Sequence, residues 1–353
     1  MEVTVHPYGK YDNQEVQAFT LKNDHGLSLT CIDYGCIITE VIAPDRNGAQ
    51  ENVVLGFDNL DGYLADQTFQ GAIVGRIAGR IRGGEFELNG KTYSLDKNEN
   101  TNHIHGGVKG FSNVVWDSTI IKEENHVGVE FKYVSKDGEG GYPGTVEMTV
   151  TYSLNNENEF LISAVGVPDA DTLLNITNHA YFNLSGNMKR DILDHELSIK
   201  SSKFLELDQE FLPTGELRDV TGTIFDFRNG RKIADGPNSK DAQIDLVGQG
   251  YDHPFLFDEK LVTLYDEASG RLLKVETNQP AVVIYTSNTM EGFEMRGGMA
   301  RPYLGVCLET QAPPDAIHHP NFPSTIIKKD EKYQWETKYT FSRDQGDGSP
   351  GPL

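Results

Sequence analysis

The chain has 353 residues and a formal net charge of −22, from 31 Lys plus Arg against 53 Asp plus Glu. A charge of this sign repels nucleic acid and anionic membranes and does not attract phosphorylated substrates, so we expect a small neutral partner. The length would suit two domains, but β-sandwiches of roughly 250 residues also occur as one unit.

The cysteines and the N-terminal sequence bear on the cellular compartment in which the protein works. Cys31, Cys36 and Cys307 are odd in number and show no CxxC spacing, which argues against a disulfide framework or a structural zinc site and fits a reducing environment. The N-terminus has no basic start followed by an apolar run, and no apolar stretch reaches about 18 residues. We therefore expect a cytoplasmic protein, monomeric or weakly dimeric, with neither a nucleic-acid nor a membrane partner.

Strand-like runs rich in β-branched and aromatic residues follow one another along the chain. The clearest hairpin is predicted at Asn89-Gly90, between the runs 85–88 and 91–95. The other predicted strands are 16–21, 27–34, 36–42, 115–122, 127–134, 145–154, 159–167, 173–184, 195–199, 204–207, 261–265, 271–276, 281–286, 304–311 and 333–341. Helical signals are limited to short turns at 58–65 and 234–237. This pattern predicts an all-β fold, a large single-domain antiparallel β-sandwich over residues 1–342, with a Gly- and Pro-rich tail at 343–353 that we expect to be disordered.

The run 173–184, LLNITNHAYFNL, has two different faces at strand period. One face is apolar except for Asn178, which suits packing on a core. The other face carries hydrogen-bonding side chains: Asn175, Thr177, His179, Tyr181 and Asn183. Burying such a row unpaired costs several kcal/mol, so it must face water or a small polar ligand.

The run 304–311, LGVCLETQ, places a carboxylate, Glu309, on a strand face otherwise formed by the small residues Gly305 and Cys307. Our working hypothesis is that His179 and Glu309 face one another across a pocket. Periodicity alone equally allows an exposed strand glutamate and a hydrogen-bonded histidine in separate places.

Two further segments are rich in glycine and in polar side chains. The segment 71–84, GAIVGRIAGRIRGG, lacks the features of a phosphate-binding loop and is read as a Gly-punctuated strand or loop. Its arginines, Arg76, Arg80 and Arg82, have planar donors suited to pairs of hydroxyls. In the segment 102–107, NHIHGG, a metal site at His103 and His105 is the minor interpretation because no carboxylate follows closely. We expect one of these histidines to be structural and the other to line the pocket.

The remaining chemistry is that of proton transfer. No nucleophile elbow, cofactor motif or serine or cysteine with an adjacent base is present, so we predict neither a cofactor nor a metal. Asp252, in the loop YDHPF, is either a further site residue or a turn former. A histidine, a glutamate, an arginine and an aspartate on a β scaffold suit acid–base work on a polyhydroxylated neutral ligand.

Over about residues 27–341, the chain resembles the aldose 1-epimerase (galactose mutarotase) family. The resemblance rests on five motifs that occur in this order along the chain: GRIAGRI, NHIHGG, TNHAYFNL, YDHPF and LETQ. The resemblance implies a large antiparallel β-sandwich with a sugar site in a concave face. It also implies interconversion of the α and β anomers of free aldohexoses such as glucose and galactose. Alternatives are a non-catalytic carbohydrate-binding protein on the same scaffold and a hexose-phosphate 1-epimerase.

The resemblance implies roles for individual residues. Glu309 would be the general base and His179 the general acid. Substrate-binding positions would be Arg80, His105, Asp252, Tyr181 and Gly79. Two positions depart from the family pattern, which commonly has Asn where this chain has Gly79 and often Gln where it has Val283.

Activity at neutral pH would need a raised pKa at His179, and a carboxylate across the pocket would favour its imidazolium form. We accordingly expect a bell-shaped pH profile whose alkaline limb belongs to His179 and whose acid limb belongs to Glu309.

Overall fold

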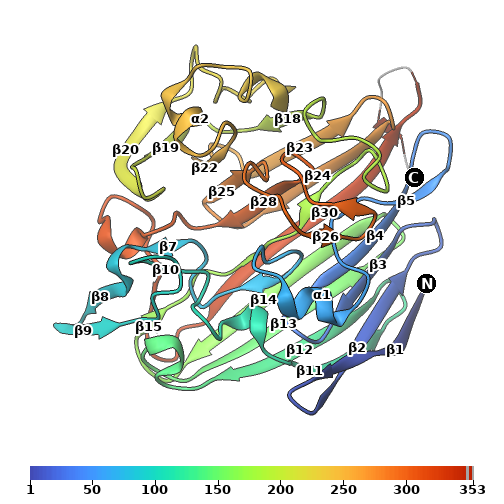
Figure 1. Cartoon of the computed structure of the whole chain (residues 1–353). Helices are drawn as coiled ribbons and strands as arrows, with labels where there is room; N and C mark the ends of the chain where they lie inside the picture. The colour runs from blue at the N-terminus through green and yellow to red at the C-terminus, as the bar shows by residue number, and fades with distance from the viewer. Residues whose placement is uncertain (347–349, 352–353) are drawn as a thin grey trace.

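The computed structural model describes residues 1–346 and 350–351. Strands dominate and pair antiparallel in the large sheets, so the predicted all-β sandwich is confirmed (Figure 1). The largest sheet has the strand order β11 (Asp117–Lys122), β12 (Val127–Ser135), β13 (Val146–Leu154), β14 (Glu159–Pro168), β30 (Tyr333–Asp344), β24 (Arg271–Thr277), β23 (Leu261–Asp266), β18 (Glu196–Ile199) and β21 (Arg231–Lys232), with β31 (Pro350–Gly351) paired to β30.

A six-stranded sheet packs against the largest sheet and carries the residues of the predicted site. Its order is β17 (Tyr181–Phe182), β28 (Val306–Gln311), β25 (Ala281–Tyr285), β22 (Asp252–Leu256), β19 (Lys203–Leu207) and β20 (Pro213–Asp219). Every residue of β28 is buried, and strands β17 and β25 flank it on its two sides. In its register, Glu309 lies opposite Val283 of β25 and Cys307 lies opposite Tyr181 of β17.

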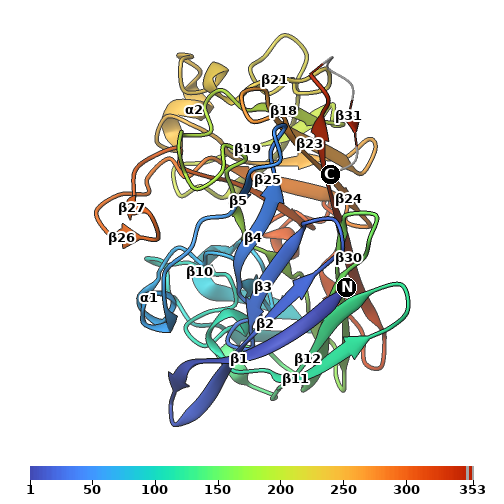
Figure 2. The same cartoon turned by 90° about the vertical axis from the view of Figure 1, so that its right-hand side faces the viewer.

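A five-stranded sheet at the N-terminus packs on the β11–β13 part of the largest sheet (Figure 2). It consists of β1 (Glu2–Tyr11), β2 (Gln14–Lys22), β3 (Ser28–Ile32), β4 (Ile38–Pro44) and β5 (Gln50–Asn52). Short two-stranded pairs complete the fold: β6 (Ile73–Val74) with β16 (Thr177–Asn178), β7 (Arg80–Ile81) with β10 (His103–Ile104), β8 (Glu85–Leu88) with β9 (Lys91–Ser94), β15 (Thr172–Leu173) with β29 (Ile326–Ile327), and β26 (Glu294–Met295) with β27 (Gly298–Met299).

Helices are short, as the sequence predicts. The α-helices are α1 (Leu60–Ala65) and α2 (Ala242–Leu246), and the 3₁₀ turns are η1 (Arg82–Gly84), η2 (Phe111–Asn113), η3 (Glu139–Gly141), η4 (Ile233–Asp235) and η5 (Ala316–His318). Among the residues that the structure describes, no helix is long and apolar enough to cross a membrane.

The main core draws side chains from both ends of the chain, from Val3 to Phe341. Strand β13 shows how the sequence produces it: alternate residues of this strand are buried, at Val146, Met148, Val150, Tyr152 and Leu154. Since successive side chains of a strand point to opposite faces, this alternation turns one face of the large sheet into core surface.

Several local predictions can be compared with the fold. The hairpin at Asn89-Gly90 is confirmed, with both residues at positive φ. A continuous strand over 173–184 is wrong, since the segment makes only the short pairings of β15, β16 and β17. Strand β1 and helix α2 were not anticipated, and the loop expected at Asp252 is wrong, since this residue begins strand β22. Strand β30 and β31 extend into the segment expected to be disordered, and residues 347–349 and 352–353 lie outside the described residues.

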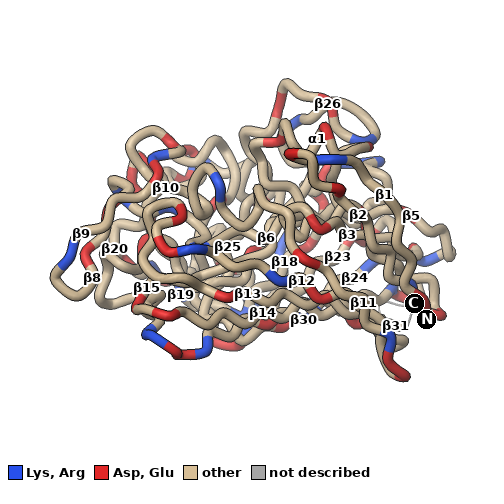
Figure 3. Tube along the Cα trace, turned by 90° about the horizontal axis from the view of Figure 1, so that it is seen from below, with Lys and Arg blue, Asp and Glu red and all other residues tan. Residues whose placement is uncertain are grey.

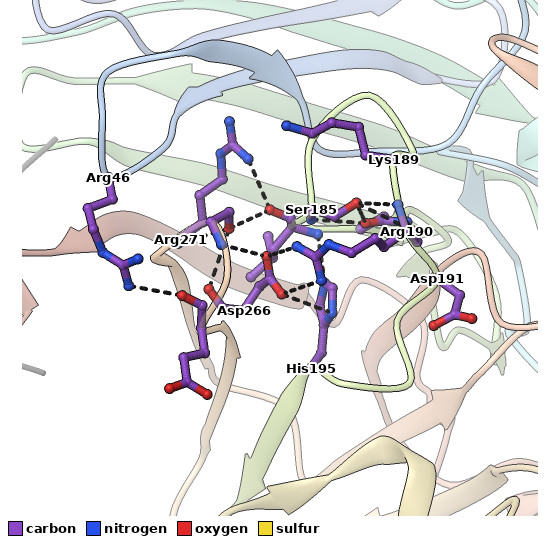
Figure 4. Close-up of polar contacts among 12 residues, drawn as sticks. Arg46, Ser185, Lys189, Arg190, Asp191, His195, Asp266 and Arg271 are labelled. Carbon is purple, nitrogen blue, oxygen red and sulfur yellow. Dashed lines mark hydrogen bonds and ion pairs between the residues drawn. The ribbon is translucent and has the colours of Figure 1, made fainter. Parts of the chain in front are cut away.

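A buried polar cluster secures the loop that follows β17 (Figure 4). Arg271, 1% exposed, donates to the carbonyl oxygens of Ala43, Leu184 and Ala49 and pairs with Glu51 at 2.9 Å. These bonds join the N-terminal sheet to the large sheet through one guanidinium. The buried positive charge of Arg271 is tolerated because its N–H donors have hydrogen-bond acceptors.

A second part of the same cluster lies one strand away. Asp266 pairs with Arg190 at 2.8 Å, and the Nε2 atom of His195 accepts a hydrogen bond from the Leu184 backbone at 2.8 Å (Figure 4). Burial lowers the pKa of His195 to about 4, although Asp266 partly opposes the shift. The segment carrying His179 is thus fixed at its C-terminal end.

Acidic residues are spread along the whole trace, with basic residues scattered among them (Figure 3). The net charge of −22 is therefore distributed over the molecule. Such a surface favours solubility and gives no local attraction for a polyanion.

Candidate active site

A cavity of about 280 Å³ lies against the six-stranded sheet, between strands β28, β25 and β22 and the pair β7–β10. All seven residues predicted from the sequence line it: Gly79, Arg80, His105, His179, Tyr181, Asp252 and Glu309. Val283 lines it as well, next to Glu309 across the β25–β28 register. Residues far apart in sequence therefore converge on one concave site.

His179 and Glu309 face one another in this cavity. The His179 Nε2 and Glu309 Oε1 atoms are 3.4 Å apart, and the two residues are 5% and 3% exposed. Glu309 comes from the centre of β28, and His179 from the turn between β16 and β17. The hypothesis that these two side chains meet across a pocket is confirmed.

The protonation of the pair differs from the expectation. Burial lowers the pKa of His179 to about 4, so a raised His179 pKa is wrong. Burial also raises the pKa of Glu309 well above its ordinary range; the nearby Asp252 carboxylate adds to this shift and Arg80 opposes it. Desolvation disfavours the charged form of each group. Both shifts therefore favour the neutral pair in the free protein, with the proton on Glu309.

Cys307 lies beside His179, on the same strand face as Glu309. Its Sγ atom is 3.6 Å from the His179 Nδ1 atom, and burial raises the pKa of the thiol well above its usual value. A neutral thiol is a weak hydrogen-bonding group, so this contact orients the imidazole without placing a charge beside it. A place beside His179 was not predicted for Cys307, although its strand position two residues before Glu309 indicates it.

His105 acts as a donor toward the cavity. Its Nδ1 atom accepts a hydrogen bond from the Gly79 backbone at 3.0 Å, and burial lowers its pKa well below the usual value. The neutral ring consequently carries its proton on Nε2. His103 is structural, as one of the two histidines was expected to be, because its ring nitrogens meet the Asp96 carbonyl oxygen and the Tyr142 hydroxyl.

The cavity contains a set of side chains with metal-ligand chemistry. Ligand atoms of His105, His179 and Glu309 all lie within 4.8 Å of one another. A metal requires a nitrogen lone pair from each imidazole, whereas the bond from Gly79 occupies the Nδ1 lone pair of His105 and leaves a proton on Nε2. The set therefore suits hydrogen bonding better than metal binding.

Arg80 reaches the cavity while held by a carboxylate. Its Nε atom pairs with Glu99 at 2.7 Å, and its guanidinium lies 5.5 Å from the centre of the Phe211 ring. The other two arginines of the motif do not line the cavity. Arg76 is buried and bonded to backbone and hydroxyl oxygens, and Arg82 pairs with Asp208 and Glu210.

The remaining predicted residues differ in what they offer a ligand. Burial raises the pKa of Asp252 to about 7, although Arg80 opposes the shift. The Tyr181 hydroxyl donates to the Thr68 carbonyl at 2.7 Å, so this ring forms a wall more than a hydroxyl clamp. Gly79 has φ +80°, and a Cβ there would lie 2.9 Å from the Pro314 side chain, which explains a glycine at this position.

Phe69 is a site residue that the sequence did not reveal. It lines the cavity, and its ring centre lies 4.8 Å from that of His105 and 5.9 Å from that of His179. Its φ of +60° is unusual for an aromatic residue, and such backbone strain tends to occur at functional sites. It lies in an irregular loop between α1 and β6, so no periodicity marks it.

Similarity to known proteins agrees with this site. The sequence pattern of aldose 1-epimerase matches residues 17–340. The chain belongs to the aldose 1-epimerase family. It is 40% identical to galactose mutarotase from Bos taurus, over 93% of this chain and 94% of that protein, and 35% identical to aldose 1-epimerase from Haemophilus influenzae, over 94% and 97%.

A solved structure shows the same fold. The crystal structure of galactose 1-epimerase from Lactobacillus acidophilus matches with a TM-score of 0.87 and 31% identity, covering 97% of this chain and 99% of that one. Family membership makes this chain an isomerase that interconverts the anomers of free aldoses.

Proposed function

We propose that Glu309 and His179 are the catalytic base and acid of this epimerase, acting on neutral aldohexoses such as glucose and galactose. The observation that carries the proposal is the buried contact of 3.4 Å between Glu309 and His179 inside the cavity. A non-catalytic sugar-binding protein has no need of such a pair. A hexose-phosphate substrate is disfavoured because Arg76 and Arg82 have partners outside the cavity, which leaves Arg80 as the arginine lining it.

The reaction requires one proton to be removed and one to be supplied. Glu309 takes the proton of the anomeric hydroxyl while His179 protonates the ring oxygen, and the ring opens to an aldehyde. The aldehyde turns about the bond to the next carbon, and the reverse transfers close the ring to the other anomer. Each positioned transfer contributes roughly 10²–10⁴-fold in rate.

The pKa directions specify where the proton starts. In the free protein the two pKa shifts favour the pair with its proton on Glu309, whereas the reactive form holds that proton on His179. These forms contain the same number of protons, so pH does not change the balance between them. Hydrogen bonds from the sugar to both side chains compensate for lost water, and we infer that they favour transfer of the proton to His179.

The surrounding side chains hold the sugar. Arg80, with planar donors, and His105, with its Nε2 proton, donate to sugar hydroxyls, and Asp252 accepts from them. Gly79 contributes backbone and Tyr181 an aromatic wall. Neither a metal nor an organic cofactor is required. We further propose a cytoplasmic protein, a monomer or a weak dimer.

Polarimetry tests this assignment directly. Freshly dissolved α-D-glucose and α-D-galactose are followed with wild type, Glu309→Gln and the control Glu157→Gln, which changes an exposed loop carboxylate. We expect Glu309→Gln to remove nearly all acceleration while still binding sugar by calorimetry, and the control to match wild type. Retention of most of the rate in Glu309→Gln would contradict the assignment.

A further inference from the structure

The adjacent residues His318 and His319 take no part in the proton transfers, and both side chains meet one buried aspartate. Asp315 is 1% exposed. Its Oδ1 atom lies 2.6 Å from the His318 Nδ1 atom, and its Oδ2 atom lies 3.4 Å from the His319 Nε2 atom. The hydrogen bond to Asp315 raises the pKa of His318, although burial opposes the shift. A buried carboxylate needs partners for its charge, and the two imidazoles lie where they can supply them.

Asp315 lies where the chain that leaves β28 meets β7. Strand β28 carries Glu309, and β7 begins with Arg80. Pro314, the residue before Asp315, lines the reaction cavity, and Asp315 itself does not. The chain after β28 thus runs from the cavity to the edge of β7 (Figure 1). Asp315 is therefore placed between the strand of the proposed base and the strand of the proposed sugar-binding arginine.

Asp315 binds the backbone of β7 on both sides of its short pairing. The Asp315 N–H donates to the Arg80 carbonyl oxygen at 3.0 Å, and the Asp315 Oδ1 atom accepts a hydrogen bond from the Arg82 N–H at 3.0 Å. The other edge of β7 pairs with β10, where Arg80 lies opposite Ile104. Asp315 thus takes the place of a second neighbouring strand, because it satisfies backbone groups that β10 does not reach.

The position of the Arg80 side chain depends on this backbone. Strand β7 has only two residues, and so short a pairing with β10 holds its backbone weakly by itself. The guanidinium lines the cavity and pairs through Nε with Glu99 at 2.7 Å. A planar guanidinium bonds a pair of hydroxyls only in the right orientation, so a small shift of the backbone below it weakens sugar binding.

We propose that the carboxylate of Asp315 is a positioning group that sets the orientation of Arg80 toward the sugar, with the two histidines holding that carboxylate in place. The proposal rests on the proposed function, in which Arg80 binds sugar hydroxyls. Removing the charge of Asp315 weakens its bonds to the imidazoles and to β7, because hydrogen bonds to a carboxylate are roughly twice as strong as those to a neutral group. The loss falls on sugar binding, and the proton transfers on the bound sugar are unchanged.

Polarimetry of α-D-glucose over a range of concentrations separates KM from kcat in Asp315→Asn. We expect KM to rise at least about fivefold and kcat to stay within about twofold of wild type. The matched control is Asp33→Asn, because Asp33 is also buried, at 5% exposed, accepts a hydrogen bond from the Gln17 N–H and does not line the cavity. The control should leave both constants within about twofold of wild type.

A double-mutant cycle tests whether Asp315 acts through Arg80. In the Arg80→Ala background, Asp315→Asn should change KM less than about twofold, because the side chain that Asp315 orients is absent. Equal increases in KM in the two backgrounds would overturn the proposal, since Asp315 would then support the cavity in general. A lower kcat at constant KM in Asp315→Asn would overturn it as well.

His318→Gln provides the test if Asp315→Asn does not fold. The His318 side chain is 33% exposed, so its replacement disturbs the fold little, and KM should rise about threefold with kcat unchanged. An unchanged KM in folded His318→Gln would overturn the proposal. The role of Arg80 is tested separately: an unchanged KM in Arg80→Ala would count against the proposed function, whereas a raised KM there and an unchanged KM in Asp315→Asn would overturn only the positioning role.

Discussion

The pH dependence of the His179–Glu309 pair gives the sharpest test of the acid–base mechanism. Burial lowers the pKa of His179 to about 4 and raises that of Glu309 above its ordinary range. At a pH between the lowered pKa of His179 and the raised pKa of Glu309, the pair holds one proton. We therefore predict a bell-shaped kcat/KM profile whose acid limb lies near pH 4 and belongs to His179, and whose alkaline limb belongs to Glu309.

Two variants separate the limbs. His179→Asn should lower kcat by at least about 100-fold and remove the acid limb, since that limb reports protonation of the imidazole. Asp252→Asn removes a negative charge that raises the pKa of Glu309, so the alkaline limb should move to lower pH. The KM of Asp252→Asn will rise as well, but the position of the limb is the diagnostic quantity.

Polarimetry of α-D-glucose between pH 3.5 and about 9, with the spontaneous rate subtracted, measures both limbs. Asp219→Asn, an exposed aspartate on β20 outside the cavity, is the control and should reproduce the wild-type profile. Persistence of the acid limb in His179→Asn would refute its assignment to the imidazole. An unmoved alkaline limb in Asp252→Asn would show that Glu309 does not produce it.

Three further results are expected. Prolonged EDTA treatment and dialysis should leave activity unchanged, because the Nε2 atom of His105 carries a proton and cannot bind a metal. A loss of activity that added zinc restores would contradict this expectation. Arg80→Ala should mainly raise KM in steady-state kinetics, since its contacts with hydroxyls persist through the reaction, and a lower kcat at constant KM would assign it another role. The free energy of unfolding should fall as pH drops from about 6.5 to 4, because His195 binds a proton in the unfolded chain but not when buried in the folded protein. In urea titrations, His195→Asn should reduce that loss of stability by about 2–3 kcal/mol. An unchanged pH dependence in His195→Asn would exclude His195 as its source.

Strand periodicity made much of the site predictable. Glu309 lies in the regular strand β28, so its face and neighbours follow from alternation alone. Alternation also assigned Ile176, Ala180 and Phe182 to the core, although that segment is no continuous strand. Of the polar side chains assigned to the opposite face, His179 and Tyr181 line the cavity, while others bond to protein backbone; Asn175, for example, donates to the Ala312 carbonyl at 2.9 Å.

Other features depend on tertiary structure that no local pattern reports. Phe69 lies in the loop between α1 and β6, and its ring packs against His105, which follows β10 and is distant in the sequence. The lowered pKa of His179 likewise depends on the depth of burial, which sequence spacing does not give. A carboxylate across the pocket was expected to dominate, but loss of water around both groups has the larger effect.

Burial of His179 and Glu309 explains why the two side chains are neutral without substrate and can become an ion pair with it. Burial favours neutral His179 and Glu309 in the free protein, whereas separating charge between them requires groups that replace water. A sugar supplies such groups at the two positions where protons move, its anomeric hydroxyl and its ring oxygen. The reactive ion pair is therefore favoured only when substrate is present, because the ligand that reacts also provides the solvation that the pair lacks.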